Sequence, residues 1–262
     1  MIEIFELIPN SFYACFLISI AVGIIGSLII INKSSFIAGS IAHGSFGGIG
    51  IAIYFGFSIL LSTSIFGGVL AVILALITLK VPHRSDAIIG AIWAVGMSIG
   101  IIFSEMSAGY SGGIISYLFG SILTISDEDI YMMIGVDFVL ILFSIFLYNQ
   151  ILLLSYDKEF GKIRNLNVTL LYVLLFVLIS QTIVMSVRAI GLILIIALFT
   201  LPPFIAEKFT KNLRGMMILS GILSFIFMIS GIVISFYYDI SATAMIILLA
   251  TFGFFVSMFK KA

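Results

Sequence analysis

One histidine in an uncharged stretch of the chain is the residue best suited to bind a metal ion. His43 lies in the sequence IAHGSFGG, residues 41–48. An imidazole at membrane depth is costly unless it faces a cavity or a partner. Neutral imidazole is a good ligand for zinc and a tolerable one for manganese or iron. The alternative interpretation is structural: a histidine that hydrogen-bonds a neighbour such as Ser40 and fixes helix packing. The sequence leaves both interpretations open.

Small residues surround this histidine. The spacing Gly44-xxx-Gly48 allows two helix backbones to approach closely, as does the spacing Gly96-xxx-Gly100. Packing is the more economical explanation of these glycines, and small residues would also leave room beside the imidazole. The candidate substrate pathway consists of Gly39, Ser40, His43, Gly44 and Gly47.

The most polar internal segment, DKEFGKIRNLN at residues 157–167, has the length of a short amphipathic helix. Its apolar residues recur with a period of three, flanked by charges. Such a segment could dock into a groove on a cytosolic partner, or it could be an ordinary solvated loop. The regular apolar spacing favours docking. The residues expected to make that contact are Asp157, Glu159, Phe160, Ile163 and Leu166.

Few acids lie near the apolar stretches. Asp239 follows two tyrosines and could receive a cation at an outer mouth, although an exposed loop residue is the simpler interpretation. Asp137 and Glu105 are expected at the ends of spans. We therefore expect neither the catalytic set of an intramembrane enzyme nor the intramembrane acids that many secondary transporters use to couple ions.

Long uncharged stretches must position these residues. Charged residues make up 9% of the 262-residue chain and hydrophobic residues 62%, whereas soluble domains carry about 25% charged residues. A helix needs about 20 apolar residues to cross a bilayer, and backbone groups in lipid must be satisfied within the segment. We therefore expect a single all-α transmembrane domain over residues 1–262 with nine crossings. The predicted runs are 12–31, 34–79 (two helices with a turn at 62–64), 87–104, 138–156, 165–187, 189–206, 215–238 and 240–259.

The distribution of basic residues predicts the orientation. With the N-terminus outside, the C-terminus inside and residues 106–126 forming a re-entrant or interfacial helix, only Arg188 of the 12 Lys and Arg residues lies outside. This arrangement obeys the positive-inside rule. If residues 106–126 spanned the membrane, Lys33, Lys80 and Arg84 would move outside.

Several other features limit the function. The single Cys15 permits no disulfide within the chain, and we expect no cleavable signal peptide. There is neither a nucleotide-binding motif nor a soluble domain in the sequence, so the energy source is expected to be another subunit or an ion gradient. We expect no cofactor and no enzymatic activity of the chain itself.

The chain resembles the membrane permease of bacterial ABC importers for zinc, manganese and iron, and it is most similar to the zinc-type permeases. The similarity extends over nearly the whole chain and depends on the order of five motifs. These are IAHGSFGG at 41–48, SYLFGSIL at 116–123 with DEDI at 127–130, DKEF at 157–160, residues 191–203 with Pro202 and Pro203, and FYYD at 236–239.

The resemblance implies a homodimeric permease in the bacterial inner membrane, two cytosolic ATPase subunits and an extracytoplasmic metal-binding protein. It also implies that residues 157–167 form the helix that meets the ATPase, and that His43 lines the metal route. Many members place an aspartate four residues before this histidine, where this chain has Gly39. That departure leaves the metal undecided, and it leaves a chelated metal or another small solute as the alternative substrate.

Overall fold

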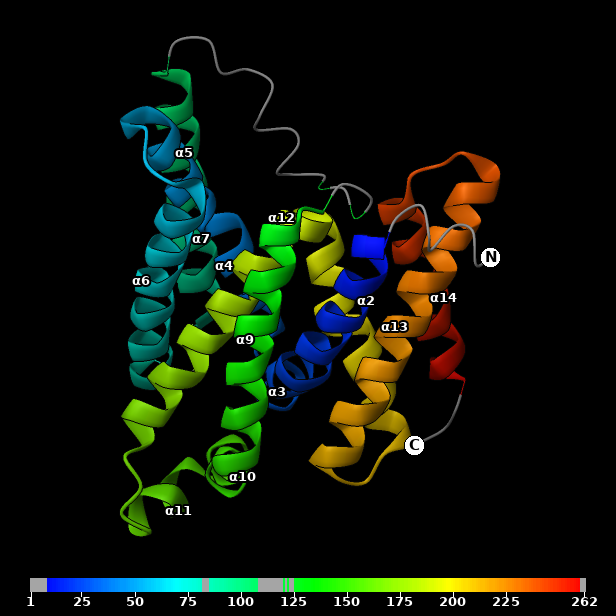
Figure 1. The fold of residues 1–262 in the computed structure, drawn as a ribbon. Helices are drawn as coiled ribbons and strands as arrows, with labels where there is room; N and C mark the ends of the chain where they lie inside the picture. The colour runs from blue at the N-terminus through cyan, green and yellow to red at the C-terminus, as the bar shows by residue number, and fades with distance from the viewer. Residues whose placement is uncertain (1–8, 82–84, 108–119, 121, 123–124, 260–262) are drawn as a thin grey trace. The chain divides into compact units, whose positions relative to one another are not determined.

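The computed structural model describes residues 9–81, 85–107, 120, 122 and 125–259, and within these residues the chain is helical, without strands (Figure 1). Among these described residues, seven helices are long and apolar enough to cross a membrane. The elements are α2 (Pro9–Ala21), the π-helical turn η1 (Val22–Gly26), α3 (Ser27–Ile31), α4 (Ser35–Gly44), α5 (Phe46–Phe55), α6 (Ile59–Lys80), α7 (Ser85–Glu105), α9 (Asp127–Phe146), α10 (Tyr148–Tyr156), α11 (Lys158–Ile163), α12 (Val168–Phe209), α13 (Leu213–Tyr238) and α14 (Ala242–Met258).

The chain forms two compact units, each assembled from separate stretches of sequence. Unit 1 contains residues 1–35, 118–148 and 185–262, and unit 2 contains residues 36–117 and 149–184. Unit 1 therefore holds α2, η1, α3, α9, the later part of α12, α13 and α14. Unit 2 holds α4 to α7, nearly all of α10, α11 and the earlier part of α12.

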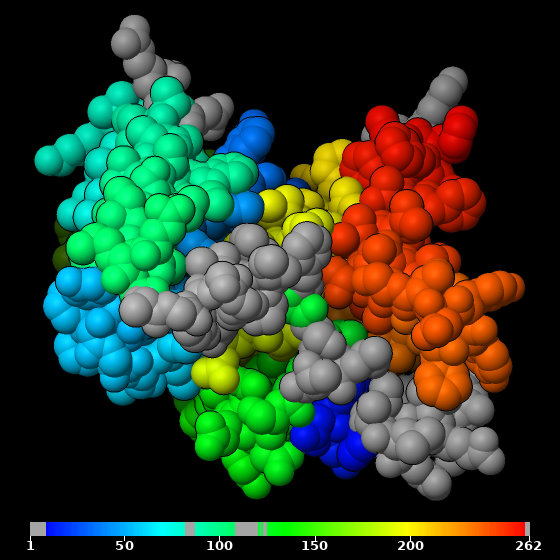
Figure 2. Space-filling model, turned by 90° about the horizontal axis from the view of Figure 1, so that it is seen from above, coloured from blue at the N-terminus to red at the C-terminus, as the bar shows by residue number. Residues whose placement is uncertain are grey.

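In unit 1, α2 packs between α9 and α13. The side-chain amide of Asn10 donates to the Asp127 carboxylate at 2.8 Å and to the Ile125 carbonyl oxygen at 3.2 Å, which ties the start of α2 to the start of α9. Helices α13 and α14 pack against each other, and their side chains lie in close contact in the space-filling view (orange and red, Figure 2).

In unit 2, glycines bring α4 and α5 into direct backbone contact with α7. A Cβ atom added to Gly96 would lie 2.5 Å from the Gly44 carbonyl oxygen, and one added to Gly100 would lie 2.5 Å from the Phe46 carbonyl oxygen. Real Cβ atoms do not approach oxygen so closely. The two Gly-xxx-Gly spacings therefore serve helix packing, as expected for small residues at membrane helix interfaces.

The predicted turn at residues 62–64 is wrong, because these residues lie inside α6. The chain turns earlier, at Gly56, whose φ of 71° caps α5 in the left-handed region. Two of the three polar side chains of the predicted turn find partners within the membrane helices instead. Ser62 donates to the Gly48 carbonyl oxygen at 2.8 Å, and Thr63 donates to that of Ile59 at 2.5 Å.

The predicted run 138–156 is also wrong at its start. Helix α9 begins at Asp127, where Ser126 and Asp129 form a reciprocal capping box. The acids of the first turn favour a helix N-terminus because of the helix dipole. Asp137 consequently lies inside a membrane-spanning helix rather than at its end, which corrects the expectation from the sequence.

Residues 165–206, predicted as two crossings separated at Arg188, correspond to the 42-residue α12. Its backbone is broken at Gly191, where φ is 77° and ψ is 166°. A continuous helix of that length would be about 63 Å long at ~1.5 Å per residue, roughly twice the hydrocarbon thickness. Two helical segments thus lie within α12. Nine crossings and their orientation stay predictions, and most of the predicted re-entrant segment 106–126 lies outside the described residues.

Candidate functional site

His43 occupies the last turn of α4, and its ring stacks on Trp93 of α7. The two ring centroids are 4.3 Å apart and the ring planes differ by 14°. The imidazole is half-buried, and its Nδ1 atom is buried without a hydrogen-bond partner. A buried ring nitrogen without a partner could act as a ligand in its neutral form.

The hydroxyl of Ser40 is used for helix packing. It is fully buried and donates to the carbonyl oxygen of Ile89 in α7 at 3.0 Å. The O–H of Ser40 therefore points to Ile89 and not to His43. In the hydrogen-bonded Ser40–His43 pair that the sequence allowed, the serine oxygen would have to act as the acceptor. The bond to Ile89 and the His43–Trp93 stack both join α4 to α7.

The three candidate glycines are buried in the same part of unit 2. Gly44 faces Gly96, and a Cβ atom on Gly47 would lie 2.6 Å from the ring of Phe66. Close packing explains Gly44 and Gly47 directly. Gly39 lies four residues before His43 on α4, which places the two residues on one helical face.

Asp239 belongs to unit 1 and is exposed at the end of α13. It occupies the left-handed region with φ 51°, where Asp is better tolerated than most residues. That conformation explains the residue as a helix cap. Among the residues that the structure describes, no three His, Cys, Asp or Glu side chains converge to hold a metal ion.

The sequence alone does not mark Trp93 and Asp137 as parts of a site. The ring of Trp93 stacks on His43 and orients it. This contact becomes visible only when α4 is seen packed against α7. Asp137 is 2% exposed in unit 1, and both of its carboxylate oxygens lack a hydrogen-bond partner. The sequence feature that could have placed Asp137 inside a helix is the capping box of Ser126 and Asp129, which starts α9 at Asp127.

Within the predicted docking segment, Lys158–Ile163 form α11, a helix of six residues. Asp157 caps it by accepting from the Phe160 N–H at 2.9 Å. The side chains of Phe160 and Ile163 are 41% and 77% exposed, so two apolar residues face outward together. Leu166 is half-buried and lies beyond the helix end, after Asn165 with its φ of 56°. The amphipathic helix is thus shorter than predicted.

Charged side chains flank these exposed apolar residues. Glu159 and Lys162 form an exposed ion pair at 2.8 Å, which contributes little to stability. The Arg164 guanidinium lies 5.3 Å from the centre of the Phe160 ring. Burial lowers the pKa of Lys158 below its usual value, while its ammonium group lies 4.2 Å from the Tyr172 ring centre. Lys158 anchors the start of α11 to α12 within unit 2.

A helical protein with several apolar spans, a membrane-embedded imidazole and a short exposed helix has the features of a multi-pass membrane transport subunit. Residues 4–261 match the ABC 3 transport family, and the chain belongs to that family. It is accordingly an ABC permease, a multi-pass protein of the bacterial inner membrane, and ATP hydrolysis is the task of a separate subunit.

Curated relatives match along nearly the whole chain. An uncharacterized membrane protein of Synechocystis is 37% identical, over 97% of this chain and 90% of that protein. A probable metal transport system membrane protein of Chlamydia pneumoniae is 33% identical, over 97% and 89%. The manganese import system permease protein ScaB of Streptococcus parasanguinis is 27% identical, over 97% and 91%, and the high-affinity zinc uptake system membrane protein ZnuB of Buchnera aphidicola is 29% identical, over 98% of each.

The fold also matches a solved structure. PsaBC from Streptococcus pneumoniae in complex with Fab superposes with a TM-score of 0.85 at 25% identity, covering 98% of this chain and 95% of the matched chain.

Proposed function

We propose that this chain is the permease of an ATP-driven importer of a divalent metal ion, with zinc as the first candidate and manganese or iron next. Its family membership and the metal named for several relatives support a metal substrate. The observation that carries the proposal is the Nδ1 atom of His43, which is buried in a membrane helix without a hydrogen-bond partner.

Zinc is favoured by the chemistry around this nitrogen. Imidazole is a borderline ligand that suits zinc, whereas manganese prefers carboxylate oxygens. Gly39, one helical turn before His43, supplies no carboxylate. Relatives named for manganese and for zinc are about equally similar to this chain, so their names do not decide the metal.

In this proposal His43 is a transient ligand. Gly39, Ser40, Gly44 and Gly47 shape the route beside it, and Trp93 fixes the plane of the imidazole. Asp239 is the weaker candidate, as a first contact for a cation at the outer face. A single protein ligand suits transport, because binding must be weak enough for release.

Helix α11 is proposed to contact the ATPase through Phe160 and Ile163, supported at its edges by Asp157, Glu159 and Leu166. The complete importer would contain a second copy of this chain, two cytosolic ATPase subunits and an extracytoplasmic metal-binding protein. Exposed apolar pairs on a short helix suit docking in a groove of a partner.

A chelated metal or another small solute is the second candidate. The observation that favours it is Gly39, because a bare cation would have only one protein ligand from α4. A chelated metal already carries its own ligands. The permease would then have to offer a route that fits the chelate, and not ligands for the metal.

The total cellular content of zinc, manganese and iron, measured in a deletion strain by elemental analysis, tests the proposal. We expect one of the three to fall and to recover with the wild-type gene. Supply of the same metal as a preformed chelate separates the two candidates. Unchanged content of all three metals in the deletion strain would overturn the proposal.

A further inference from the structure

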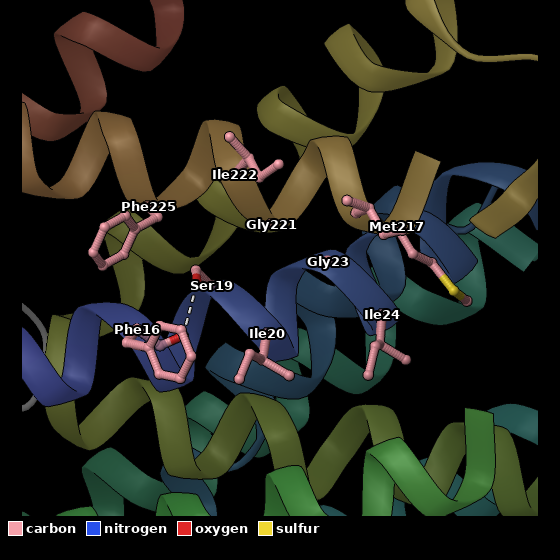
Figure 3. A pocket seen from close by; sticks show the side chains of 10 residues that line it. Phe16, Ser19, Ile20, Gly23, Ile24, Met217, Gly221, Ile222 and Phe225 are labelled. Atoms are coloured by element: carbon pink, nitrogen blue, oxygen red, sulfur yellow. Dashed lines mark hydrogen bonds between the residues drawn. The ribbon is translucent and has the colours of Figure 1, made fainter. Parts of the chain in front are cut away.

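A groove lies on unit 1 between α2 with η1 and α13 (Figure 3). Its volume is about 400 Å³. The groove forms because the two helices touch at a glycine crossing: a Cβ atom on Gly23 would lie 2.7 Å from the Met217 carbonyl oxygen and 3.4 Å from Gly221. The larger side chains on either side of this crossing form the walls of the groove. They are Phe16, Ile20, Ile24, Ile218, Ile222 and Phe225.

The groove offers almost nothing to a polar ligand. The only side-chain hydroxyl in its lining is that of Ser19, and it already donates to the Phe16 carbonyl oxygen at 2.6 Å. All the lining residues belong to helices that are long and apolar enough to cross a membrane. An occupant of this groove must therefore be a hydrocarbon chain or an apolar helix.

The two ends of the groove differ in chemistry. At one end Phe225 packs edge-to-face against Phe12 and Phe16, with ring centroids 5.8 and 6.3 Å apart, so this end of the groove is aromatic. At the other end, basic residues follow α3 and flank the start of α13. Because Ser19 pairs with Gly221 and Gly23 with Met217, α2 and α13 are antiparallel.

Antiparallel packing brings the end of α3 to the start of α13, and these elements are in contact. Lys33 follows α3, and Lys211 and Arg214 flank the start of α13. All three side chains are exposed. The Arg214 guanidinium lies 4.4 Å from the centre of the Tyr148 ring, which orients it. Glu207 is the one acid in the sequence 207–214, so this end of the groove carries excess positive charge.

We propose that this groove binds an anionic phospholipid, with an acyl chain between α2 and α13 and the phosphate head group near Lys33, Lys211 and Arg214. Basic clusters beside membrane helices bind anionic head groups. The basic end is the side that the positive-inside distribution assigns to the cytoplasm. From Phe225 to Met217 the groove is about 12 Å long at ~1.5 Å per residue, which suits the part of an acyl chain nearest the head group.

Lipid retention by the purified permease–ATPase complex tests the proposal. The complex would be reconstituted in nanodiscs with equal amounts of phosphatidylglycerol and phosphatidylcholine, re-extracted and analysed by native mass spectrometry. We expect wild type to retain phosphatidylglycerol in several-fold excess. Ile222 lines the groove and is 51% exposed, so Ile222→Trp should fill the groove with a larger side chain. Ile226 is 50% exposed and does not line the groove, so Ile226→Trp is the matched control.

Ile222→Trp should lose the bound lipid, and Ile226→Trp should keep it. The pair Lys211→Gln with Arg214→Gln should keep a lipid but lose the preference for phosphatidylglycerol. Equal lipid retention by the two tryptophan variants would overturn the proposal. So would dissociation of two permease copies in Ile222→Trp alone, because the groove would then be an interface between copies of this chain.

Discussion

The imidazole of His43 lies nearly parallel to the indole of Trp93, with 4.3 Å between the ring centroids and 14° between the planes. Aromatic stacks of this kind contribute about 0.5–1.5 kcal/mol beyond the burial of area. The stack joins α4 to α7 and fixes the plane in which the ring nitrogens can bind a ligand. It also supplies a structural reason for an aromatic ring at position 43, so packing and ligation must be separated by experiment.

His43→Phe separates these two roles, because phenylalanine keeps an aromatic ring against Trp93 and removes the ligand nitrogens. If His43 binds the transported ion, uptake should fall at least about tenfold, since even the loss of an outer-shell partner costs ~10–100-fold in metal affinity. Uptake of radioactive zinc, manganese and iron into cells measures this effect. His43→Ala is the companion variant. Wild-type uptake of zinc, manganese and iron by His43→Ala or His43→Phe would identify His43 as a packing residue.

Gly39→Asp tests the choice of metal. The change adds a carboxylate one helical turn from the imidazole, on the same face of α4. A hard oxygen ligand should shift uptake from zinc toward manganese or iron, and tighter binding should slow release of the ion. Competition between the three metals, compared with Gly39→Asn as a neutral control of similar size, measures the shift. An unchanged order of preference would show that position 39 lies away from the route.

The spans of unit 1 at the C-terminal end were predictable from the sequence. The uncharged runs 215–238 and 240–259 differ from α13 and α14 by two residues or fewer at each end, because charges and the tyrosines at 237–238 mark the ends of the apolar stretch. The predicted turn at 62–64 failed for an equally physical reason. Ser62 and Thr63 look like turn residues in sequence, but each hydroxyl donates to a carbonyl oxygen within the helices.

The site was only partly predictable. His43 was identified because an imidazole among apolar residues is unusual, which is a property of the local sequence. Its partner Trp93 is fifty residues further along the chain, and the packing of α4 against α7 at Gly44–Gly96 and Ser40–Ile89 brings them together. The sequence misplaces Asp137, because the uninterrupted uncharged run begins only after it. The capping box at Ser126 and Asp129 starts the helix earlier, and the membrane helix therefore includes a buried acid.

Phe160→Asp tests the contact of α11 with the ATPase. Burial of an unpaired carboxylate against a partner is costly, so less ATPase subunit should be recovered with the purified permease, and transport should fall several-fold. Lys162→Gln is the control on the same helix, because it removes only an exposed ion pair that contributes little. Normal ATPase recovery together with wild-type uptake in Phe160→Asp would mean that α11 is a solvated loop element.

Arg188→Gln tests the ion pair that joins α12 to α9 in unit 1. The guanidinium lies 2.9 Å from the Asp129 carboxylate, and the two side chains are 28% and 14% exposed. Asp129 also accepts from the Ser126 hydroxyl at 2.7 Å, so loss of the arginine leaves a carboxylate without its counter-ion at a helix start. We expect a loss of about 1–3 kcal/mol, seen as a lower melting temperature in detergent. Arg188→Lys should recover part of it; a melting temperature unchanged in Arg188→Gln would show that the pair is not stabilising.

Cysteine labelling tests the predicted orientation. In a Cys15→Ser background, Glu128→Cys places a thiol at the start of α9 and Lys162→Cys places one on α11, and both native side chains are exposed. The positive-inside distribution predicts that a membrane-impermeant maleimide labels position 128 in intact cells and position 162 only after the membrane is opened.

Ser85→Cys, at the start of α7, tests whether residues 106–126 span the membrane. It should label only from the cytoplasm, because a spanning segment at 106–126 would move Lys33, Lys80 and Arg84 outside. Labelling of position 85 in intact cells would therefore reject both the nine-crossing arrangement and the re-entrant segment.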